Sequence, residues 1–93
     1  MGRKNQTMEY NLFYCVSCGS LNYRLPRRKG KQREAGHLKR LYCPHCQEDI
    51  NHAEVTISGP YTSEEFCFEL FEGNFDKNGM RINPSWKSFI NSK

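Results

Sequence analysis

The 93-residue sequence contains no run of about 18 apolar residues, which a membrane-spanning helix needs. Its first ten residues, MGRKNQTMEY, lack the apolar stretch of a secretory signal. We therefore expect a cytoplasmic protein with no membrane partner. The N-terminal half is also poor in large aliphatic side chains, and so short a chain is marginal at burying a core. We expect one domain over residues 1–93 that needs a structural metal.

Basic residues are missing from a long segment of the chain. Residues 41–76 contain eight acidic residues and neither lysine nor arginine, whereas residues 24–40 contain eight basic residues against the single anion Glu34. The formal net charge of +4 therefore hides a strongly basic segment of net charge +7 that precedes an acidic one.

An export signal is lacking and the cysteine count is odd, at five, so a disulfide framework is not expected. Cys15 and Cys18 form one Cys-x-x-Cys pair, and Cys43 and Cys46 form a second pair after 24 intervening residues. This spacing is close to that of four-cysteine zinc sites, in which four thiolates surround the ion tetrahedrally. We predict one structural Zn²⁺ on these cysteines, because four sulfurs leave no open position for catalysis.

Other candidate metal ligands are less well placed. His45 lies within the second cysteine turn and His52 lies six residues beyond Cys46, so either could replace a cysteine. Cys67 lies between two phenylalanines on a predicted helix, where a small buried hydrophobic residue is more common than a reactive thiol.

The elements flanking the cysteines are predicted to be strands. Residues 10–14 lead into the first cysteine turn, where Gly19 suits a backbone position with positive φ. Residues 21–25 alternate apolar and polar side chains and end at Pro26, which completes a hairpin over residues 10–25. Residues 26–36 are predicted to be an exposed loop. Residues 38–42 and 51–57 form a second hairpin around the second turn, with Ala53, Val55 and Ile57 on one face.

A short helix is predicted over residues 63–72. Thr62 and Glu65 have the spacing of a capping box, Phe66, Leu70 and Phe71 provide an apolar face, and Gly73 ends the helix. Residues 84–90 offer one or two further helical turns. The predicted fold is a small α+β domain: a four-cysteine unit of two β-hairpins over residues 8–58, with a helical C-terminal extension over residues 59–93 packed on it.

Several short motifs point to a family. Cys15-Val-Ser-Cys18-Gly19, Pro26-Arg-Arg-Lys-Gly30 and Leu41-Tyr-Cys-Pro44, followed by Asn51-His52, are similar to the small zinc-ribbon proteins encoded by bacteriophages. The resemblance covers roughly residues 12–56. It implies a zinc ribbon, a phage origin and the cytoplasm of a host cell, but no particular activity, because zinc ribbons bind nucleic acids, dock on proteins or serve as scaffolds.

Two function classes compete for the charged segments. The basic segment is suited to phosphate contacts, with Tyr23 and Tyr42 at its edges able to stack on unpaired bases, as in a low-specificity DNA- or RNA-binding protein or a transcription regulator. Its candidate residues are Arg24, Arg27, Arg28, Lys29, Lys31, Arg33, Lys39 and Arg40. Alternatively, the basic segment could be a solvated loop with no direct role, or the acidic helix could fold back on it. The acidic helix could also dock on a host protein and modulate host enzymes, defence or transcription. The candidate docking residues are Glu64, Glu65, Phe68, Glu69 and Glu72.

An enzyme is the least expected class. Nucleases of the HNH type combine Cys-x-x-Cys turns with a catalytic histidine, and His37 or His52 invites that comparison. However, the sequence offers no second set of histidine, asparagine and acidic residues on a strand-to-helix element, so no catalytic residue is predicted.

Overall fold

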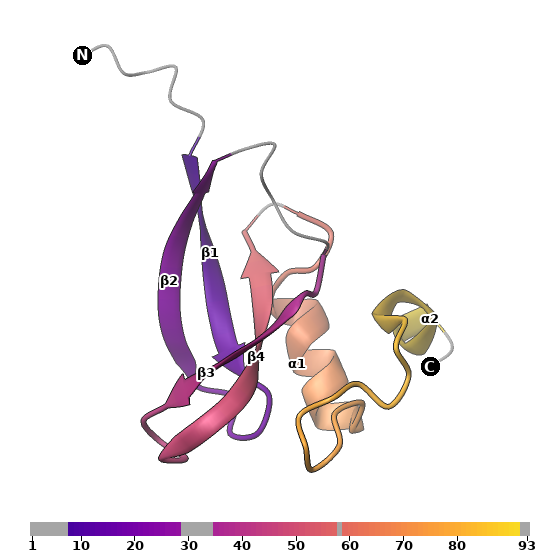
Figure 1. Cartoon of the computed structure of the whole chain (residues 1–93). Coiled ribbons are helices and arrows are strands. Elements are labelled where there is room, and N and C mark those ends of the chain that lie inside the picture. Colours follow the sequence, from indigo (N-terminus) through magenta and orange to yellow (C-terminus); the bar gives the residue numbers. More distant parts are fainter. Residues whose placement is uncertain (1–7, 29–34, 58, 92–93) are drawn as a thin grey trace, which may run out of the picture.

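The structure is a computed structural model that describes residues 8–28, 35–57 and 59–91. In these ranges it has four strands and two helices: β1 (Met8–Cys15), β2 (Leu21–Arg28), β3 (Leu38–Cys43), β4 (Glu48–Thr56), α1 (Ser63–Glu72) and α2 (Trp86–Asn91). The strands form one antiparallel sheet in the order β2-β1-β4-β3. The predicted α+β architecture of two hairpins followed by a short helix is confirmed (Figure 1).

The sheet joins the two hairpins through their inner strands. Antiparallel pairing of β1 with β4 sets Cys15 opposite His52 and Tyr14 opposite Ala53. The two outer strands, β2 and β3, are therefore the sheet edges, and the segment that connects them runs from one edge to the other.

Strand β2 is longer than predicted. The sequence predicted that it would end before Pro26, but Pro26 lies within β2, opposite Tyr10, and the strand continues to Arg28. An edge strand pairs with a neighbour on one side only, so a residue without a backbone N–H is tolerated there. As a result, Arg27 and Arg28 lie on a strand and not in the predicted loop, and Arg24 lies on the same strand, as predicted.

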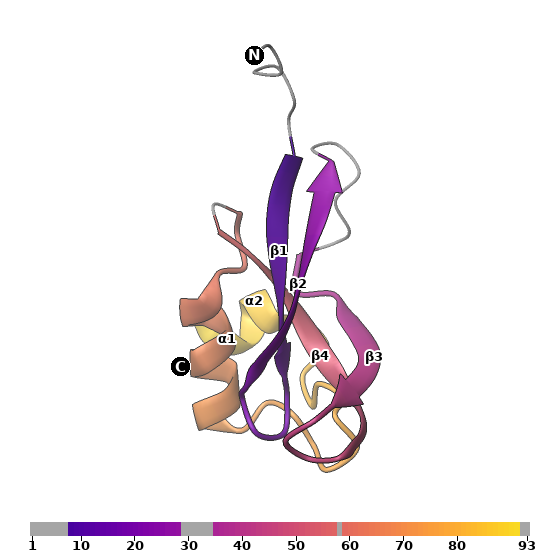
Figure 2. The ribbon, with the colours of Figure 1, turned by 90° about the vertical axis from the view of Figure 1, so that its left-hand side faces the viewer.

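Helix α1 packs on the sheet beside β4, and α2 lies next to α1 (Figures 1 and 2). Phe66 is buried and its ring stacks on Tyr14 with a centroid distance of 5.1 Å. Tyr61 is fully buried and makes an edge contact of 4.9 Å with Trp86. Leu70 also packs on this core, so Phe66 and Leu70 of the predicted apolar face do contact the sheet.

The predicted ends of α1 are confirmed. The Thr62 backbone N–H donates to the Glu65 carboxylate over 2.9 Å as part of a capping box, and Gly73 ends the helix with φ of 83°. Burial opposes ionisation of Glu65, but its hydrogen bonds to Thr62 outweigh this effect and lower its pKa. In the described ranges, neither helix is long and apolar enough to cross a bilayer.

The predicted faces of α1 and β4 are wrong at three apolar positions. Phe71 is 85% exposed, because five residues at about 100° per residue rotate it about 140° away from Phe66. Cys67, predicted to be a small buried residue, is exposed for the same reason, as it lies about 100° from Phe66. Ile57 is 71% exposed, because β4 ends at Thr56 and the alternation of the strand does not extend to it.

Glu69 is buried, although the sequence placed it on the exposed acidic face of the helix. Its carboxylate accepts hydrogen bonds from Arg81 Nε at 2.8 Å and Arg81 Nη2 at 2.9 Å. The Tyr61 hydroxyl and Asn74 Nδ2 donate to the same carboxylate, each at 2.5 Å. Burial and the neighbouring Glu69 raise the pKa of Tyr61, so its hydroxyl remains a donor. Glu69 is thus a structural residue and not a docking residue.

Arg81 and Trp86 also connect the C-terminal extension to the start of the second hairpin by hydrogen bonds. Arg81 Nη1 donates to the Gly36 carbonyl at 2.6 Å, and Trp86 Nε1 donates to the Ala35 carbonyl at 3.1 Å. Gly36 has φ of 76°, and a Cβ there would lie 2.9 Å from Trp86 Cδ1. Only glycine allows this close approach without strain.

Candidate metal centre

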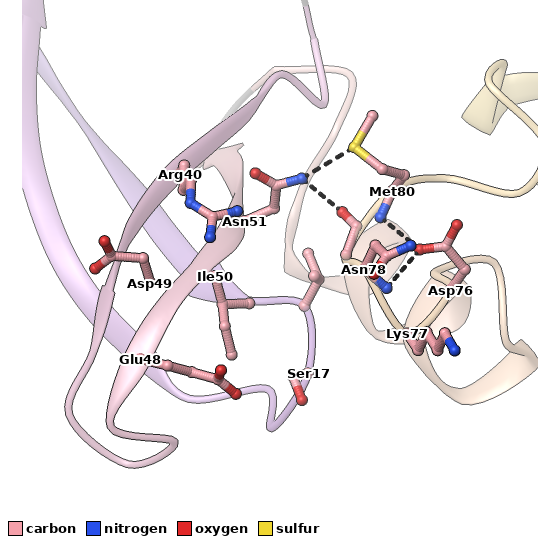
Figure 3. Close-up of a pocket in the computed structure, with 12 residues that line it drawn as sticks. Ser17, Arg40, Glu48, Asp49, Ile50, Asn51, Asp76, Lys77, Asn78 and Met80 are labelled. Atoms are coloured by element: carbon pink, nitrogen blue, oxygen red, sulfur yellow. Dashed lines mark hydrogen bonds between the residues drawn. The ribbon is translucent and has the colours of Figure 1, made fainter.

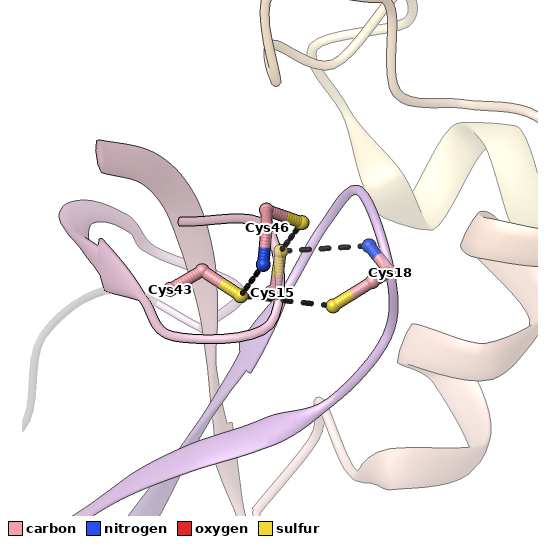
Figure 4. Close-up of side chains that lie close together, drawn as sticks. All are labelled: Cys15, Cys18, Cys43 and Cys46. Atoms are coloured by element: carbon pink, nitrogen blue, oxygen red, sulfur yellow. Dashed lines mark hydrogen bonds between the residues drawn. The ribbon is translucent and has the colours of Figure 1, made fainter. Parts of the chain in front are cut away.

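Two turns at one end of the sheet carry the four predicted ligands. Cys15 ends β1 and begins the turn to β2, and Cys43 ends β3 and begins the turn to β4. Because β1 and β4 are paired, the two turns lie side by side and their cysteines face one another (Figure 4). Cys15 and Cys43 are fully buried, whereas Cys18 is exposed.

The distances between the sulfurs fit a single metal ion. All four Sγ atoms lie within 4.8 Å of one another, with 4.0 Å between Cys15 and Cys46 and 3.7 Å between Cys18 and Cys43. A tetrahedron of sulfurs with metal–sulfur bonds of about 2.3 Å has edges of about 3.8 Å. The cysteines are free thiols, and in the described residues they are the one group of at least three cysteine, histidine or acidic side chains that could hold a metal. The predicted four-cysteine cluster is confirmed.

Backbone amides in both turns point toward the sulfurs. The N–H groups of Ser17 and Cys18 donate to Cys15 Sγ at 3.3 and 3.5 Å, and the N–H of Cys46 donates to Cys43 Sγ at 3.4 Å. These donors stabilise thiolates, which are the form of cysteine that binds metal ions. The two turns therefore present charge-stabilised sulfurs to the space between them.

The two turns share a backbone pattern that the sequence showed at only one of them. Gly19 has φ of 80°, and its N–H donates to the Cys15 carbonyl at 2.9 Å. The equivalent residue of the second turn is Gln47, with φ of 60° and an N–H that donates to the Cys43 carbonyl at 2.6 Å. The Gly19 prediction is confirmed. Gln47 was missed because glutamine gives no signal for a left-handed conformation.

Acidities of the thiols differ across the cluster. Burial opposes ionisation of Cys43, but the Cys46 N–H and the Asn22 amide outweigh it and lower its pKa to about 5. Burial, together with the neighbouring sulfurs, raises the pKa of Cys46 to about 12, and burial also raises the pKa of Cys15. Once one thiolate forms, a second is repelled by it, so full deprotonation needs a compensating cation. The donor set therefore fits a divalent thiophilic metal.

The histidines are not part of the sulfur cluster. His45 is exposed in the second turn. The carbonyl of the half-buried His37 accepts a hydrogen bond from the Glu54 N–H at 2.8 Å. His52 is fully buried behind the cluster, where its Nε2 lies 3.0 Å from Asn22 Nδ2, and the same amide nitrogen lies 3.3 Å from Cys43 Sγ. No sequence pattern predicted this Asn22 contact.

The structure places part of the basic segment on the sheet edges. Arg24 is exposed on β2, and Lys39 and Arg40 are exposed on β3. Lys29, Lys31 and Arg33 lie outside the described residues, as do the side chains of Arg27 and Arg28 at the end of β2.

The two tyrosines predicted to stack on bases differ in accessibility. The Tyr23 ring packs edge-on against His52 at 5.7 Å, and its hydroxyl donates to the Tyr42 carbonyl at 2.7 Å, so this ring is engaged within the sheet. Tyr42 is 49% exposed, and Tyr10, which was not predicted to contact bases, is 51% exposed beneath the Arg24 guanidinium.

The remaining residues of the predicted docking surface divide into two groups. Glu64 and Glu72 are exposed on α1. Glu65 caps the helix, and Phe68 is half-buried against Phe89 with a ring distance of 6.0 Å. The accessible surface of α1 is therefore smaller than predicted, and Phe71 belongs to it.

A groove of about 590 Å³ lies between the β3–β4 hairpin and the turn at residues 76–80 (Figure 3). Arg40 and Lys77 line it together with Glu48, Asp49 and Asp76. With three carboxylates and two cations, the lining of the groove is of mixed charge.

Comparisons of the chain with protein-family models, with curated proteins and with solved structures found no match. The structure therefore defines a small α+β fold with a cluster of four cysteines that could hold one metal ion.

Proposed function

We propose that this protein binds nucleic acid with little sequence preference, through phosphate contacts made by its basic segment. The observation that carries the proposal is the charge of residues 24–40, with eight cations against one anion. Arg24, Lys39 and Arg40 are exposed on the two edge strands where this segment begins and ends. Clustered lysines and arginines attract phosphates by releasing condensed counterions.

Exposed aromatic rings near these cations support contact with unpaired bases. Tyr10 on β1 and Tyr42 on β3 are about half exposed. Bases stack on aromatic side chains without regard to sequence. The exposed carboxylates of α1, Glu64 and Glu72, would repel a phosphate backbone, which argues against α1 as a recognition helix in the major groove.

The metal is proposed to be one structural Zn²⁺ bound by Cys15, Cys18, Cys43 and Cys46. Thiolate ligands and the tetrahedral sulfur spacing suit zinc. A zinc ion with four thiolates carries a net charge of about −2, which lowers the charge of the loaded protein from +4 to about +2. Phosphate attraction would then be a property of the basic segment and not of the whole molecule.

The phage resemblance extends the proposal to a biological setting. A phage-encoded protein of this kind would act in the cytoplasm of its host, as a non-enzymatic nucleic-acid binder in transcription or its regulation. No catalytic step is part of the proposal.

Binding should be measured as a function of salt on labelled duplex and single-stranded DNA. If about four cations reach phosphates, log K plotted against log salt should have a slope of about −4 on duplex DNA and about −3 on single strands. Replacing Arg27, Arg28, Lys29 and Lys31 with serine should abolish binding without changing metal content. A matched control replaces Lys4, Lys77, Lys87 and Lys93 with serine, which removes the same charge elsewhere and should retain most of the affinity. Equal losses in the two variants, or no binding by the parent at low salt, would refute the proposal.

A second candidate function is docking of α1 on a basic surface of a host protein. Phe71 is 85% exposed on the outward side of α1, between the exposed Glu64 and Glu72. A large aromatic residue framed by acidic groups suits a basic protein groove with an apolar centre. Pulldown from nuclease-treated bacterial lysate tests it: a captured protein should be lost with Phe71→Ser and retained with Ile57→Ser, a control that is also exposed. If untreated lysate yields only nucleic acid and nuclease-treated lysate yields nothing, docking is refuted.

A further inference from the structure

His52 has a fixed hydrogen-bonding direction. Its Nδ1 lies 2.8 Å from the Ile50 carbonyl oxygen, which can only accept, so Nδ1 carries the hydrogen. Its Nε2 lies 3.0 Å from Asn22 Nδ2, an amide nitrogen that can only donate, so Nε2 accepts. His52 is therefore held as the Nδ1–H tautomer by partners on both sides, and its full burial leaves it no access to water.

The orientation of the Asn22 amide follows from the metal site. Asn22 Nδ2 lies 3.3 Å from Cys43 Sγ, and a metal-bound thiolate can only accept hydrogen bonds. The nitrogen and not the oxygen must therefore face the sulfur, and its two hydrogens are directed to Cys43 and to His52. On the other side of the amide, the Ser20 hydroxyl lies 3.1 Å from Asn22 Oδ1 and 3.1 Å from Cys18 Sγ, and its one hydrogen can be donated to either acceptor.

An irregularity in the pairing of β1 with β2 directs the Asn22 side chain toward the four cysteines. Phe13 pairs with Tyr23 and Tyr14 pairs with Leu21, so Asn22 is the extra residue of a bulge in β2. Bulges re-aim side chains and are over-represented next to functional sites. Asn22 thus leaves the regular alternation of β2 and reaches Cys43, which lies on the opposite edge strand of the sheet.

We propose that Asn22 is a positioning residue of the metal centre, held by its hydrogen bond to His52 so that its amide donates to the Cys43 thiolate. Cys43 is fully buried, so its negative charge depends on such donors in place of water. The contact also joins the two hairpins, because it links β2 to β3 and, through His52, to β4. Residues in this outer position typically change metal affinity by 10- to 100-fold when they are replaced.

Asn22→Asp tests the proposal because it keeps the shape of the side chain and removes the donor. Its Zn²⁺ affinity, measured by competition with a chromophoric chelator, should fall by about 10- to 100-fold. The Co²⁺-loaded variant should keep the absorption spectrum of four thiolate ligands, since no ligand has changed. The matched control is Asn78→Asp, an exposed asparagine in the turn at residues 76–80, which should bind Zn²⁺ as the parent does.

Two replacements at His52 distinguish its role as the hydrogen-bond acceptor for Asn22 from its role in packing. His52→Gln offers an amide oxygen that can accept from Asn22, and it should retain more of the affinity than His52→Phe, which fills the space but cannot accept. Affinity of Asn22→Asp within about twofold of the parent, or equal affinities of the two His52 variants, would overturn the proposal. So would a Co²⁺ spectrum of the parent that indicates a histidine ligand.

A measurement on the unmodified protein keeps the proposal falsifiable if these variants fail to fold. Nitrogen chemical shifts of His52 in the zinc-loaded protein should show the hydrogen on Nδ1 and an acceptor nitrogen at Nε2. A hydrogen found on Nε2 would mean that Asn22 does not donate to His52, and it would refute the arrangement on which the proposal rests.

Discussion

Replacing Arg81 with methionine should destabilise the protein by about 3–5 kcal/mol, because it leaves the Glu69 carboxylate buried without its cation. The side chains of Arg81 and Glu69 are 9% and 0% exposed, and two hydrogen bonds join them. Hydrogen bonds to charged groups contribute about 1.5–3 kcal/mol each, which gives the same order for the pair. The bond from Arg81 to the Gly36 carbonyl is lost as well.

Urea unfolding monitored by fluorescence of the single tryptophan measures this loss, because Trp86 packs 4.9 Å from Tyr61 in the same network. Free zinc must be held constant, since metal bound only by the folded state adds to the measured stability. Lys87→Met, which removes an exposed cation from the same extension, should change the stability by no more than about 0.5 kcal/mol.

A double-mutant cycle tests whether the loss arises from the pair itself. Glu69→Gln keeps an acceptor for Tyr61 and Asn74, and combining it with Arg81→Met should cost less than the sum of the single changes, because no unpaired charge remains buried. A loss below about 1 kcal/mol for Arg81→Met, or additive effects in the cycle, would refute a buried, coupled ion pair.

Three further expectations concern the metal turns and the cap of α1. Gly19→Ala should cost about 1–2 kcal/mol, because φ of 80° is strained for alanine and its Cβ would lie 3.0 Å from Leu70, whereas Gln47→Gly should be neutral or slightly stabilising in the same urea assay. Native mass spectrometry should show one zinc per chain, and chelation should unfold the hairpins in circular dichroism, since zinc contributes on the order of 10 kcal/mol to folding in such domains. The folded-state pKa of Glu65 is lowered, so its stabilisation is present above its unfolded pKa of about 4.3 and is lost as pH falls through the folded value. The stability difference between the parent and Glu65→Gln should therefore be constant near neutral pH and shrink in acid; a difference that grows in acid would contradict this sign.

The ligands could be predicted from sequence because their geometry is local. Each Cys-x-x-Cys turn sets its own two sulfurs, and the similar turns need only be brought together by strand pairing. The residues around those sulfurs could not be predicted in the same way. Asn22 reaches Cys43 only because of a bulge in β2, and His52 reaches Asn22 only through the register of β1 with β4. Neither the bulge nor the register can be predicted from a pattern in the sequence.

The residues at which helix α1 begins and ends were predicted correctly, but its buried face was predicted incorrectly. The predicted buried face consisted of Phe66, Leu70 and Phe71. It left out the acidic residues, since an acidic residue is rarely buried without a partner. The partner of Glu69 is Arg81, twelve residues further along the chain and beyond the end of the helix. Once Glu69 turns inward to meet that guanidinium, the helical period forces Phe71 outward.

Two separate sets of hydrogen bonds hold the basic segment on the sheet. At the metal end of the sheet, Asn22 donates to Cys43 and the Tyr23 hydroxyl donates to the Tyr42 carbonyl, so β2 and β3 are tied together across the cluster. Where the segment returns to the sheet, Arg81 and Trp86 donate to the carbonyls of Gly36 and Ala35. The exposed cations on β2 and β3 therefore lie on strands whose positions depend on the four-cysteine cluster and on the buried ion pair. If these cations bind phosphates, removing zinc should weaken binding even though it makes the net charge of the protein more positive, an outcome opposite to that expected from charge alone.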